Sequence, residues 1–533
     1  MADPHTRPLG AQISHMLKDR GVEVIFGIPG VHNQEMYRGI EEAGITHVLA
    51  RHEQGAGFMA DGYARATGSP GVAYVITGPG VCNIMTPMGQ AYSDSVPLLV
   101  ISSCLDETAA RRGQLHQMKD QRAAAATVCD WSEEARTAQA AYTLIDRAFS
   151  EYQTDRPRPK HIQVPIHQLE SEAAPGWDRF YEPAYARPVP LLDKMDTVAH
   201  KMRAARRPLF VFGGGAKTAF TQARQVLEMT NAASFCTYAG RGIVAPDNPL
   251  YFGSYLARPD SANICAKADL LVLVGTDMAE VDLWRADSGA SCHTVHVNID
   301  AEVLACGQAG DSRIFSDANE FLRGLGARLQ EHTPATDWAA KEVSAARSKW
   351  RTEVEAEYPG IPGIADALRS CLPEKTMIYS DMTQFAYCAK EIWDMDHPGH
   401  WHHPYGFGTL GYALPAAIGG AIGRTGKPTM AIIGDYGFHY TMQELGVAVE
   451  LGLPIPIILW DNGKLGAIEA SMVGAQIAPN AVVARNPDFV KLAEAFGAAA
   501  VAPDTLDELQ KAVQAAFNAE GPTLIYLTPA ISG

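Results

Sequence analysis

Two short polar motifs near the C-terminus combine the side chains that bind a metal ion with the turns that bind phosphate. The first is the run Gly434-Asp435-Tyr436-Gly437, and the second is Asp461-Asn462-Gly463. A carboxylate and an amide oxygen suit a hard divalent cation such as Mg²⁺, which keeps other positions for phosphate oxygens and water. A helix that begins beside them would add backbone N–H groups and a positive dipole end for the phosphates. The two motifs together predict a site for a metal-bound diphosphate.

The segments between the motifs predict how they are positioned. Residues 431–433 and 454–460 are apolar and rich in β-branched side chains, which is typical of buried strands. Gly434 to Gly437 is expected to form the turn after the first strand, and residues 441–451 have the apolar spacing of a helix. If the two strands are parallel neighbours, Asp435 and Asn462 lie at the same edge of one sheet.

Composition excludes several classes of protein. The chain has 533 residues, 47% of them hydrophobic and 20% charged, with a net charge of −16. This charge makes nucleic acid and anionic membranes poor partners. We expect neither a membrane-spanning helix nor a signal peptide. The nine cysteines form no Cys-x-x-Cys pair, so we expect reduced thiols in a cytoplasmic protein.

The order of apolar segments predicts an α/β protein with three units. Helical patterns alternate with short apolar strands, which implies doubly wound parallel sheets with crossover helices. The expected domains are residues 1–175, 190–330 and 360–533, with a linker rich in proline and aromatic residues between the first two.

Further motifs in the first and third units carry a resemblance to a known family. They are Phe26 to Gly30 (Phe-Gly-Ile-Pro-Gly), Arg51 to Arg65, Ile76 to Asn83 (Ile-Thr-Gly-Pro-Gly-Val-Cys-Asn) and Tyr405 to Gly419. In order and spacing, these motifs and the opening pair resemble the thiamine diphosphate enzymes of the acetolactate synthase and pyruvate decarboxylase group. The resemblance covers essentially the whole chain. It implies a pyrimidine-binding domain, a central Rossmann-like domain and a diphosphate-binding domain, with thiamine diphosphate and Mg²⁺ as cofactors.

The resemblance also implies roles for particular residues. Glu53 would hydrogen-bond the ring nitrogen of the aminopyrimidine, the Gly408 carbonyl would accept from its exocyclic amine, and Leu410 would separate the two rings of the cofactor. The implied metal ligands are Asp435, Asn462 and the backbone carbonyl near Lys464. The other implied cofactor contacts are Gly78, Asn83, Gly434, Tyr436, Gly437, Leu465 and Gly466.

The position of Tyr436 departs from the family pattern. The family usually has glycine there, followed by a small residue where this chain has Gly437. Glycine lets the backbone approach a diphosphate, so the tyrosine side chain must point away from it. We expect cofactor binding to survive, because Asp435 and the start of the helix remain.

The resemblance also predicts how the chain assembles. Glu53 and Asp435 lie in different domains, and in this family each active site is built from two subunits. A homodimer is then the smallest active unit, and a homotetramer is expected.

Four side chains bear on the reaction. Related lyases also place a histidine at the position of His32, and Gln117 matches the family's active-site glutamine. His116 beside it is a candidate proton carrier. Glu469 resembles the glutamate that pyruvate decarboxylases use to deliver a proton. The alternative for His32, His116 and Glu469 is an ordinary structural or surface role.

An acid in the pocket favours decarboxylation of a 2-oxo acid over ligation of two carbonyl compounds. It could instead pair with a cationic substrate tail. The wording of residues 26–37 and 434–460 resembles 5-guanidino-2-oxopentanoate decarboxylases, and Glu35 or Glu469 could pair with a guanidinium. We therefore hypothesise decarboxylation of a 2-oxo acid to an aldehyde and CO₂, with this guanidino acid as the best single substrate.

Other functions compete with this hypothesis. An acetolactate synthase-like or benzaldehyde lyase-like carboligase would join two carbonyl compounds instead. A flavin- or nucleotide-dependent oxidoreductase is suggested by Gly213-Gly214-Gly215 after an apolar strand, but the run lacks the full dinucleotide-binding pattern. A non-catalytic paralogue is disfavoured because Glu53, Asp435 and Asn462 are all present. The pairs His402-His403 and Arg111-Arg112 are expected at the surface or at an interface.

Overall fold

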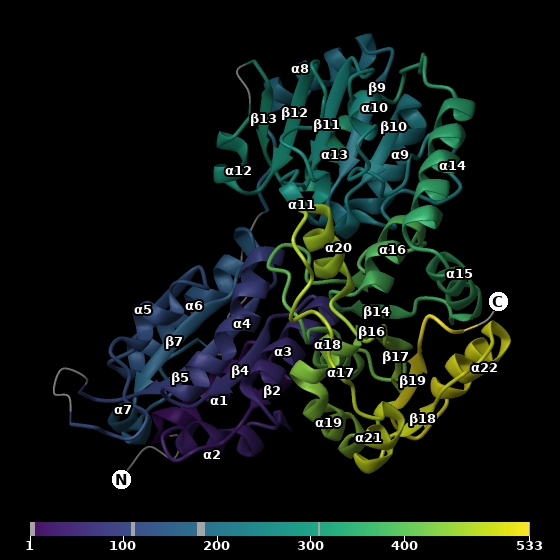
Figure 1. Ribbon diagram of the computed structural model, residues 1–533. Helices are drawn as coiled ribbons and strands as arrows, with labels where there is room; N and C mark the ends of the chain where they lie inside the picture. Colours follow the sequence, from purple (N-terminus) through teal and green to yellow (C-terminus); the bar gives the residue numbers. More distant parts are fainter. Residues whose placement is uncertain (1–5, 108–111, 179–186, 308–309, 532–533) are drawn as a thin grey trace. The chain divides into compact units, whose positions relative to one another are not determined.

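The protein consists of three α/β parts, each built on a parallel sheet (Figure 1). The structure is a computed structural model, which describes residues 6–107, 112–178, 187–307 and 310–531. The chain divides into two compact units. Unit 1 combines the N-terminal segment with residues 376–383 and 403–531, and unit 2 combines the central segment with residues 384–402. The predicted fold class, three α/β domains with parallel sheets, is confirmed.

The N-terminal sheet of unit 1 has the strand order β3-β2-β4-β5-β7-β6. Helices link its strands, as parallel pairing requires. The strands are β2 (Val24–Gly27), β3 (Thr46–Leu49), β4 (Gly71–Val75), β5 (Leu98–Cys104), β6 (Trp131–Glu134) and β7 (Lys160–Pro165). The helices are α1 (Leu9–Asp19), α2 (Gln34–Glu42), α3 (Glu53–Thr67), α4 (Pro79–Asp94), α5 (Gln121–Ala125), α6 (Ala138–Thr154) and α7 (Ile166–Glu170). A small antiparallel pair joins β1 (Arg7–Pro8) to β8 (Glu172–Ala173).

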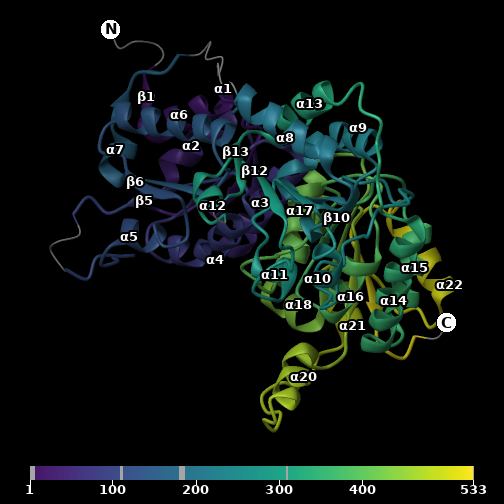
Figure 2. The same cartoon turned by 90° about the horizontal axis from the view of Figure 1, so that it is seen from above.

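The C-terminal sheet of unit 1 contains the order β14-β16-β17-β19-β18. Its strands are β14 (Met377–Ser380), β16 (Thr429–Gly434), β17 (Pro456–Trp460), β18 (Ala499–Val501) and β19 (Thr523–Leu527). Its helices are α17 (Ala413–Gly423), α18 (Asp435–Thr441), α19 (Leu445–Glu450), α20 (Gly466–Gly474), α21 (Phe489–Ala495) and α22 (Leu506–Ala516), with the 3₁₀ turn η3 at Met442–Glu444. Figure 2 shows α20 projecting beyond α18 and α21.

Helices α3 and α17 pack closely within unit 1 and join its two sheets into one core. A Cβ atom on Gly62 would lie 2.0 Å from the carbonyl oxygen of Ala416, and one on Gly419 would lie 1.8 Å from that of Met59. Only glycine permits so close an approach of two helix backbones. The hydroxyl of Tyr379 also donates to the Gly62 carbonyl at 2.8 Å. The helix that begins with Glu53 is therefore fixed to the part of the chain that carries Asp435.

Unit 2 has a parallel sheet in the order β10-β9-β11-β12-β13. Its strands are β9 (Pro208–Phe212), β10 (Ala233–Cys236), β11 (Leu270–Val274), β12 (His293–Asn298) and β13 (Ser312–Phe315), and the short β15 is Trp401–His402. Its helices are α8 (Leu192–Ala204), α9 (Phe220–Thr230), α10 (Ser261–Cys265), α11 (Glu280–Leu283), α12 (Ala301–Ala305), α13 (Ala318–Arg328), α14 (Ala340–Glu357), α15 (Ile361–Cys371) and α16 (Gln384–Ile392), with 3₁₀ turns η1 (Gly214–Ala219) and η2 (Tyr238–Gly240).

The glycine run after β9 has a packing role. A Cβ on Gly213 would lie 2.3 Å from the carbonyl oxygen of Gly275, and one on Gly215 would lie 3.0 Å from the Cα of Gly275. The turn after β9 is thus packed against the turn after β11. This close packing explains why glycines occur at positions 213 and 215, and no bound nucleotide is needed to explain them.

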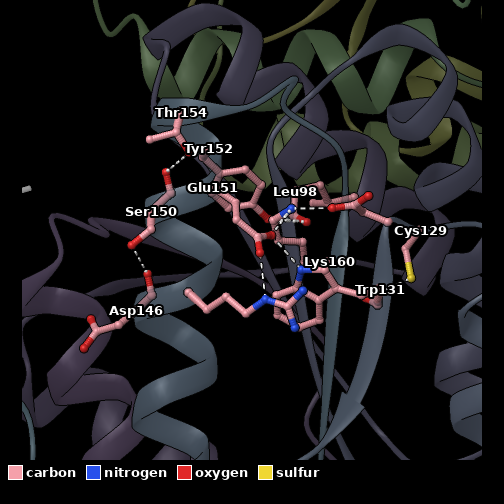
Figure 3. A network of polar contacts seen from close by, with 11 residues as sticks. Leu98, Cys129, Trp131, Asp146, Ser150, Glu151, Tyr152, Thr154 and Lys160 are labelled. Atoms are coloured by element: carbon pink, nitrogen blue, oxygen red, sulfur yellow. Dashed lines mark hydrogen bonds and ion pairs between the residues drawn. The ribbon is translucent and has the colours of Figure 1, made fainter. Parts of the chain in front are cut away.

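Lys160 on β7 is a buried cation that holds the edge of the N-terminal sheet together (Figure 3). Its side chain is 1% exposed, and its Nζ lies 2.8 Å from the carboxylates of both Asp130 and Glu151. The rings of Trp131 and Tyr152 face the ammonium group at 5.6 and 5.1 Å. A buried charge is tolerated when it is paired in this way, and it is costly to remove one partner.

We expect Lys160→Met to lower the free energy of unfolding by about 3 kcal/mol, because it leaves Glu151 and Asp130 without their shared cation. Urea unfolding followed by tryptophan fluorescence measures this loss. The control is Lys491→Met, which removes a lysine that is 81% exposed and paired with Asp488. It should change stability by less than about 0.5 kcal/mol. Equal effects of the two substitutions would contradict the structural role of Lys160.

The prediction that His402 and His403 lie at the surface or at an interface is wrong, because both are buried within the chain. The two residues are 5% and 1% exposed, and the Nδ1 atom of His403 lies 2.9 Å from the Ser380 hydroxyl. The sequence does not predict this burial, because two adjacent polar residues in a short segment are typical of an exposed loop. Arg111 lies outside the described residues.

Composition also led to expectations for the cysteines and the helices. All nine cysteines are free thiols. Across the described residues, no helix combines the length and apolar character needed to cross a bilayer.

Candidate active site

Glu53 begins α3 at the carboxyl edge of the N-terminal sheet, as predicted, and its side chain is buried. His52 caps the helix, because its Nδ1 accepts the backbone N–H of Gln54 at 3.1 Å. The side-chain amide of Asn83, on α4, donates to Oε2 of Glu53 at 2.8 Å. Within the described residues no hydrogen bond is made to Oε1. The structure thus brings together Glu53 and Asn83, and it presents a carboxylate with one oxygen fixed and the other able to accept from a ligand.

His32 and His116 come from different loops and meet edge to face, with ring centroids 4.9 Å apart. The carbonyl of His116 packs on Gly78, where a Cβ would lie 2.4 Å from its oxygen, and Gly78 has a φ of +73°. In both rings Nδ1 is buried without a hydrogen-bond partner in the part of the chain described. Burial, and then the neighbouring His116, lower the pKa of His32. These features suit a neutral imidazole that exchanges a proton with a ligand.

Gln117 is half-buried beside His116. Its Oε1 lies 3.4 Å from the backbone nitrogen of Gln114, and its backbone N–H donates to the Gln114 carbonyl. The predicted residues of the N-terminal domain therefore gather at one edge of its sheet.

Asp435 and Asp461 follow neighbouring strands of the C-terminal sheet. Strands β16 and β17 are parallel, with Gly434 opposite Trp460, so the prediction of adjacent parallel strands is confirmed. The prediction of a turn at Gly434 to Gly437 is wrong, because α18 begins at Asp435 itself. Gly434 precedes the helix in extended conformation, and Tyr436 is half-buried in its first turn. Asp435 therefore lies directly at a helix N-terminus.

Asn486 bridges the two carboxylates and was not anticipated from the sequence. Its Nδ2 donates to Oδ2 of Asp435 and to Oδ1 of Asp461, both at 2.8 Å. Tyr526 donates to the other oxygen of Asp461 at 2.8 Å. Burial, opposed by the Asn486 hydrogen bond, raises the pKa of Asp435, and the charge of Asp461 acts in the same direction. Two carboxylates so close together favour a cation.

The remaining predicted metal ligands lie in the segment that follows Asp461. Oδ1 of Asn462 accepts the backbone N–H of Lys464 at 3.2 Å. Leu465 donates its backbone N–H to Val482, and Gly466 begins α20. The described residues contain no cluster of three or more histidine, cysteine or acidic side chains placed to hold a metal. A cation beside Asp435 would therefore need amide and carbonyl oxygens, which are the ligand types predicted at Asn462 and Lys464.

The two candidate carboxylates for substrate binding both have basic neighbours. Glu469, in the first turn of α20, pairs with Lys464 at 2.5 Å. Glu35, in the first turn of α2, accepts from two nitrogens of Arg38 at 2.6 and 2.8 Å. Glu469 is thus held by one contact and Glu35 by two.

Asp381 positions the loop that carries Gly408 and Leu410. Its buried carboxylate accepts the backbone N–H groups of Met382, at 2.7 Å, and Gly411, at 2.8 Å. Burial raises the pKa of Asp381 to about 6 against the effect of these hydrogen bonds. A Cβ on Gly437 would lie 2.9 Å from Asp381, so the same carboxylate also contacts α18. Asp381 directly follows β14, just as Asp435 directly follows β16. An aspartate at the end of an apolar strand is therefore the sequence feature that could have identified Asp381.

The predicted residues therefore form two sets within unit 1. One surrounds Glu53 and the other surrounds Asp435. In the described chain, no hydrogen bond or ion pair joins Glu53 to Asp435, Asp461 or Asn486.

Comparison with known proteins identifies the family of the chain. Three family models match: the N-terminal thiamine pyrophosphate binding domain over residues 7–124, the central domain over 195–325, and the C-terminal thiamine pyrophosphate binding domain over 381–527. The chain belongs to the thiamine pyrophosphate enzymes.

Curated relatives match over nearly the full length. The chain is 40% identical to "Probable 2-ketoarginine decarboxylase AruI" of Pseudomonas aeruginosa, over 99% of this chain and 95% of that protein. It is 27% identical to the acetolactate synthase isozyme 2 large subunit of Escherichia coli, over 97% and 95%. It is 29% identical to the acetolactate synthase of Mycobacterium bovis, over 92% and 82%. The predicted family is confirmed.

Proposed function

We propose that the protein uses thiamine diphosphate and Mg²⁺ to decarboxylate a 2-oxo acid to an aldehyde and CO₂. The observation that carries the proposal is the buried Glu53 carboxylate, held by Asn83 in a chain that matches both thiamine pyrophosphate binding domains. When bound, thiamine diphosphate supplies a carbon nucleophile and an acceptor for the electron pair left by CO₂.

The residues of the chain would bind the cofactor at its two ends. Asp435, Asn462 and the carbonyl of Lys464 would hold Mg²⁺, and the N-terminus of α18 would face the diphosphate. The donor types fit, because the two carboxylates bridged by Asn486 leave an excess of negative charge. Glu53 would hold a proton on the aminopyrimidine nitrogen, and His32 with His116 would move a proton at the substrate.

We further propose that a second copy of the chain completes each site. Glu53 and Asp435 share no hydrogen bond or ion pair in the described chain. Large apolar side chains are also exposed beside both sets: Val31 at 62% and Leu115 at 60% near the histidines, and Ile468 at 52% and Val473 at 59% on α20. Exposed apolar groups of this size favour a protein interface. A homodimer would cover them and bring Glu53 of one copy to Asp435 of the other.

The proposed substrate is 5-guanidino-2-oxopentanoate, which is 2-ketoarginine. The proposal is supported by the 40% identity to a protein named for that activity. Glu469 is the carboxylate that we propose for the guanidinium, because it accepts one hydrogen bond from its basic neighbour Lys464, while Glu35 accepts two from Arg38.

The test supplies the purified protein with thiamine diphosphate, Mg²⁺ and one oxo acid at a time. We expect 5-guanidino-2-oxopentanoate to give CO₂ and 4-guanidinobutanal in equal amounts. 2-Oxopentanoate, which has the same carbon chain without the guanidinium, should react with a much lower kcat/KM. Pyruvate, alone or with 2-oxobutanoate, tests the acetolactate synthase-like alternative. A 2-hydroxy ketone as the main product would reject the decarboxylase and favour the carboligase.

Asn486 should support the proposed metal site. Asn486→Ala removes the donor that orients Asp435 and Asp461, so we expect Mg²⁺ to bind about 10- to 100-fold more weakly. Calorimetric titration of Mg²⁺ in the presence of thiamine diphosphate measures this. Asn480→Ala, at an exposed position of the same segment, is the control and should have no effect. Unchanged Mg²⁺ affinity in Asn486→Ala would remove the residue from the site.

A further inference from the structure

Glu444 is a fully buried acidic residue that no step above uses. It ends η3, which follows directly from α18, and its side chain is 0% exposed. Its two carboxylate oxygens lie 3.2 and 3.0 Å from the backbone nitrogen of Arg51, two residues before Glu53. The backbone N–H of His52 also points to this carboxylate. A side chain from the C-terminal part of unit 1 therefore binds the residues that lead into α3.

The first turn of α3 is shaped to admit this carboxylate. A Cβ on Gly55 would lie 2.3 Å from Oε1 of Glu444, so any larger residue would displace it. The N–H groups at a helix start have no partners inside the helix. The Nδ1 atom of His52 accepts the N–H of Gln54, and Glu444 accepts the N–H groups of Arg51 and His52, just before the helix. A negative charge at this end of the helix is also favourable.

The far part of α3 is held separately. The hydroxyl of Tyr412 donates to Asp61 at 2.8 Å, and Arg65 bridges Asp61 and Asp94 at 2.7 and 2.9 Å. Asp94 in turn accepts the backbone N–H of Gly406 at 3.2 Å. With these contacts and the α17 packing, we expect the helix to stay in place without Glu444. Glu444 instead fixes the backbone conformation of residues 51–54, the turn that contains Glu53.

We propose that Glu444 is a positioning residue for Glu53: by binding the Arg51 and His52 backbone it sets the direction in which the Glu53 carboxylate meets the aminopyrimidine. This inference rests on the proposed function for its chemical consequence. The anchoring itself is a property of the chain alone.

The stability of the protein should distinguish positioning from a structural role. Burial raises the pKa of Glu444 to about 7, opposed by the N–H groups of Arg51 and His52, by the Arg51 charge and by Gln443. The guanidinium of Arg51 also pairs with the carboxylate of Glu450. Because the folded pKa exceeds the usual 4.5, this group's contribution to stability is complete below pH 4.5 and is lost as the pH rises through 7. At pH 8 Glu444→Gln should therefore unfold at a temperature no lower than that of the wild type.

The test compares Glu444→Gln with Glu450→Gln. The second substitution removes an exposed carboxylate that pairs with the side chain of the same arginine, Arg51. In the cofactor-free protein, amide hydrogen exchange of the peptide covering residues 51–56 should be on the order of tenfold faster in Glu444→Gln and unchanged in the control. In the loaded protein, exchange of the thiamine C2 proton with deuterated solvent should slow on the order of 10- to 100-fold. Affinity for thiamine diphosphate should change by less than about threefold, because Asp435 is untouched.

The results separate the two proposals. If the wild type binds no thiamine diphosphate, the proposed function fails, while the amide exchange still reports whether Glu444 anchors the turn. If Glu444→Gln leaves amide exchange unchanged, or leaves C2 exchange unchanged in a protein that binds the cofactor, the positioning role is overturned. A fall in unfolding temperature at pH 8 that accounts for the lost C2 exchange would likewise assign Glu444 a merely structural role.

Discussion

Glu53→Gln should reduce kcat for decarboxylation by about 10²- to 10⁴-fold, the usual worth of a general acid or base. The amide keeps the size of the side chain and can keep the contact with Asn83, but it cannot hold a proton on the aminopyrimidine nitrogen. Because the diphosphate end of the cofactor is bound elsewhere, affinity for thiamine diphosphate should fall far less than kcat. Steady-state kinetics with a calorimetric titration of the cofactor separates the two effects.

The control for Glu53 is Glu41→Gln, at an exposed position of α2 in the same domain. It should leave kcat and cofactor affinity unchanged. A Glu53→Gln protein with full turnover would exclude Glu53 from the chemistry, whatever its burial.

Asp435→Ala should weaken Mg²⁺-dependent binding of thiamine diphosphate at least about 100-fold, a loss of roughly 2.7 kcal/mol. The substitution removes a buried carboxylate at the start of α18, where the metal and the diphosphate would meet. The loss should appear as weaker binding of both Mg²⁺ and the cofactor, because each depends on the other. Titration of either one at saturating concentrations of the other measures it.

Asp507→Ala is the matched control, since Asp507 is an exposed carboxylate in the first turn of α22. Binding should be unaffected. If Asp435→Ala keeps the Mg²⁺ dependence of the wild type, the metal lies elsewhere.

The parts of the fold set by local pattern could be predicted from the sequence. Apolar runs followed by glycine and a small-residue helix placed Glu53 at the start of α3 and Asp435 after β16. Parallel pairing of β16 with β17 followed from the helical segment between them. The start of α18 was missed because Gly434 and Gly437 suggested a turn, while the helix begins between them.

Side chains whose partners lie far along the chain could not be found in this way. Asn486 lies in a segment without periodicity, and only the folded chain brings it between Asp435 and Asp461. From its sequence position, Glu444 would lie on the polar face of a helix, yet it is buried because α3 packs over it. His403 was expected at the surface or at an interface, but it is buried, because tertiary packing overrides a local polar pattern.

The central claim is that Glu53 of one copy and Asp435 of another act on the same cofactor. Glu53→Gln and Asp435→Ala proteins, each nearly inactive alone, can be mixed, dissociated and reassembled. A mixed dimer would contain one site with both residues intact, so an equal mixture should recover about a quarter of the wild-type activity. If each site instead takes both residues from one chain, every site in the mixture carries one substitution and stays inactive. A mixture that recovers no activity would therefore contradict the account.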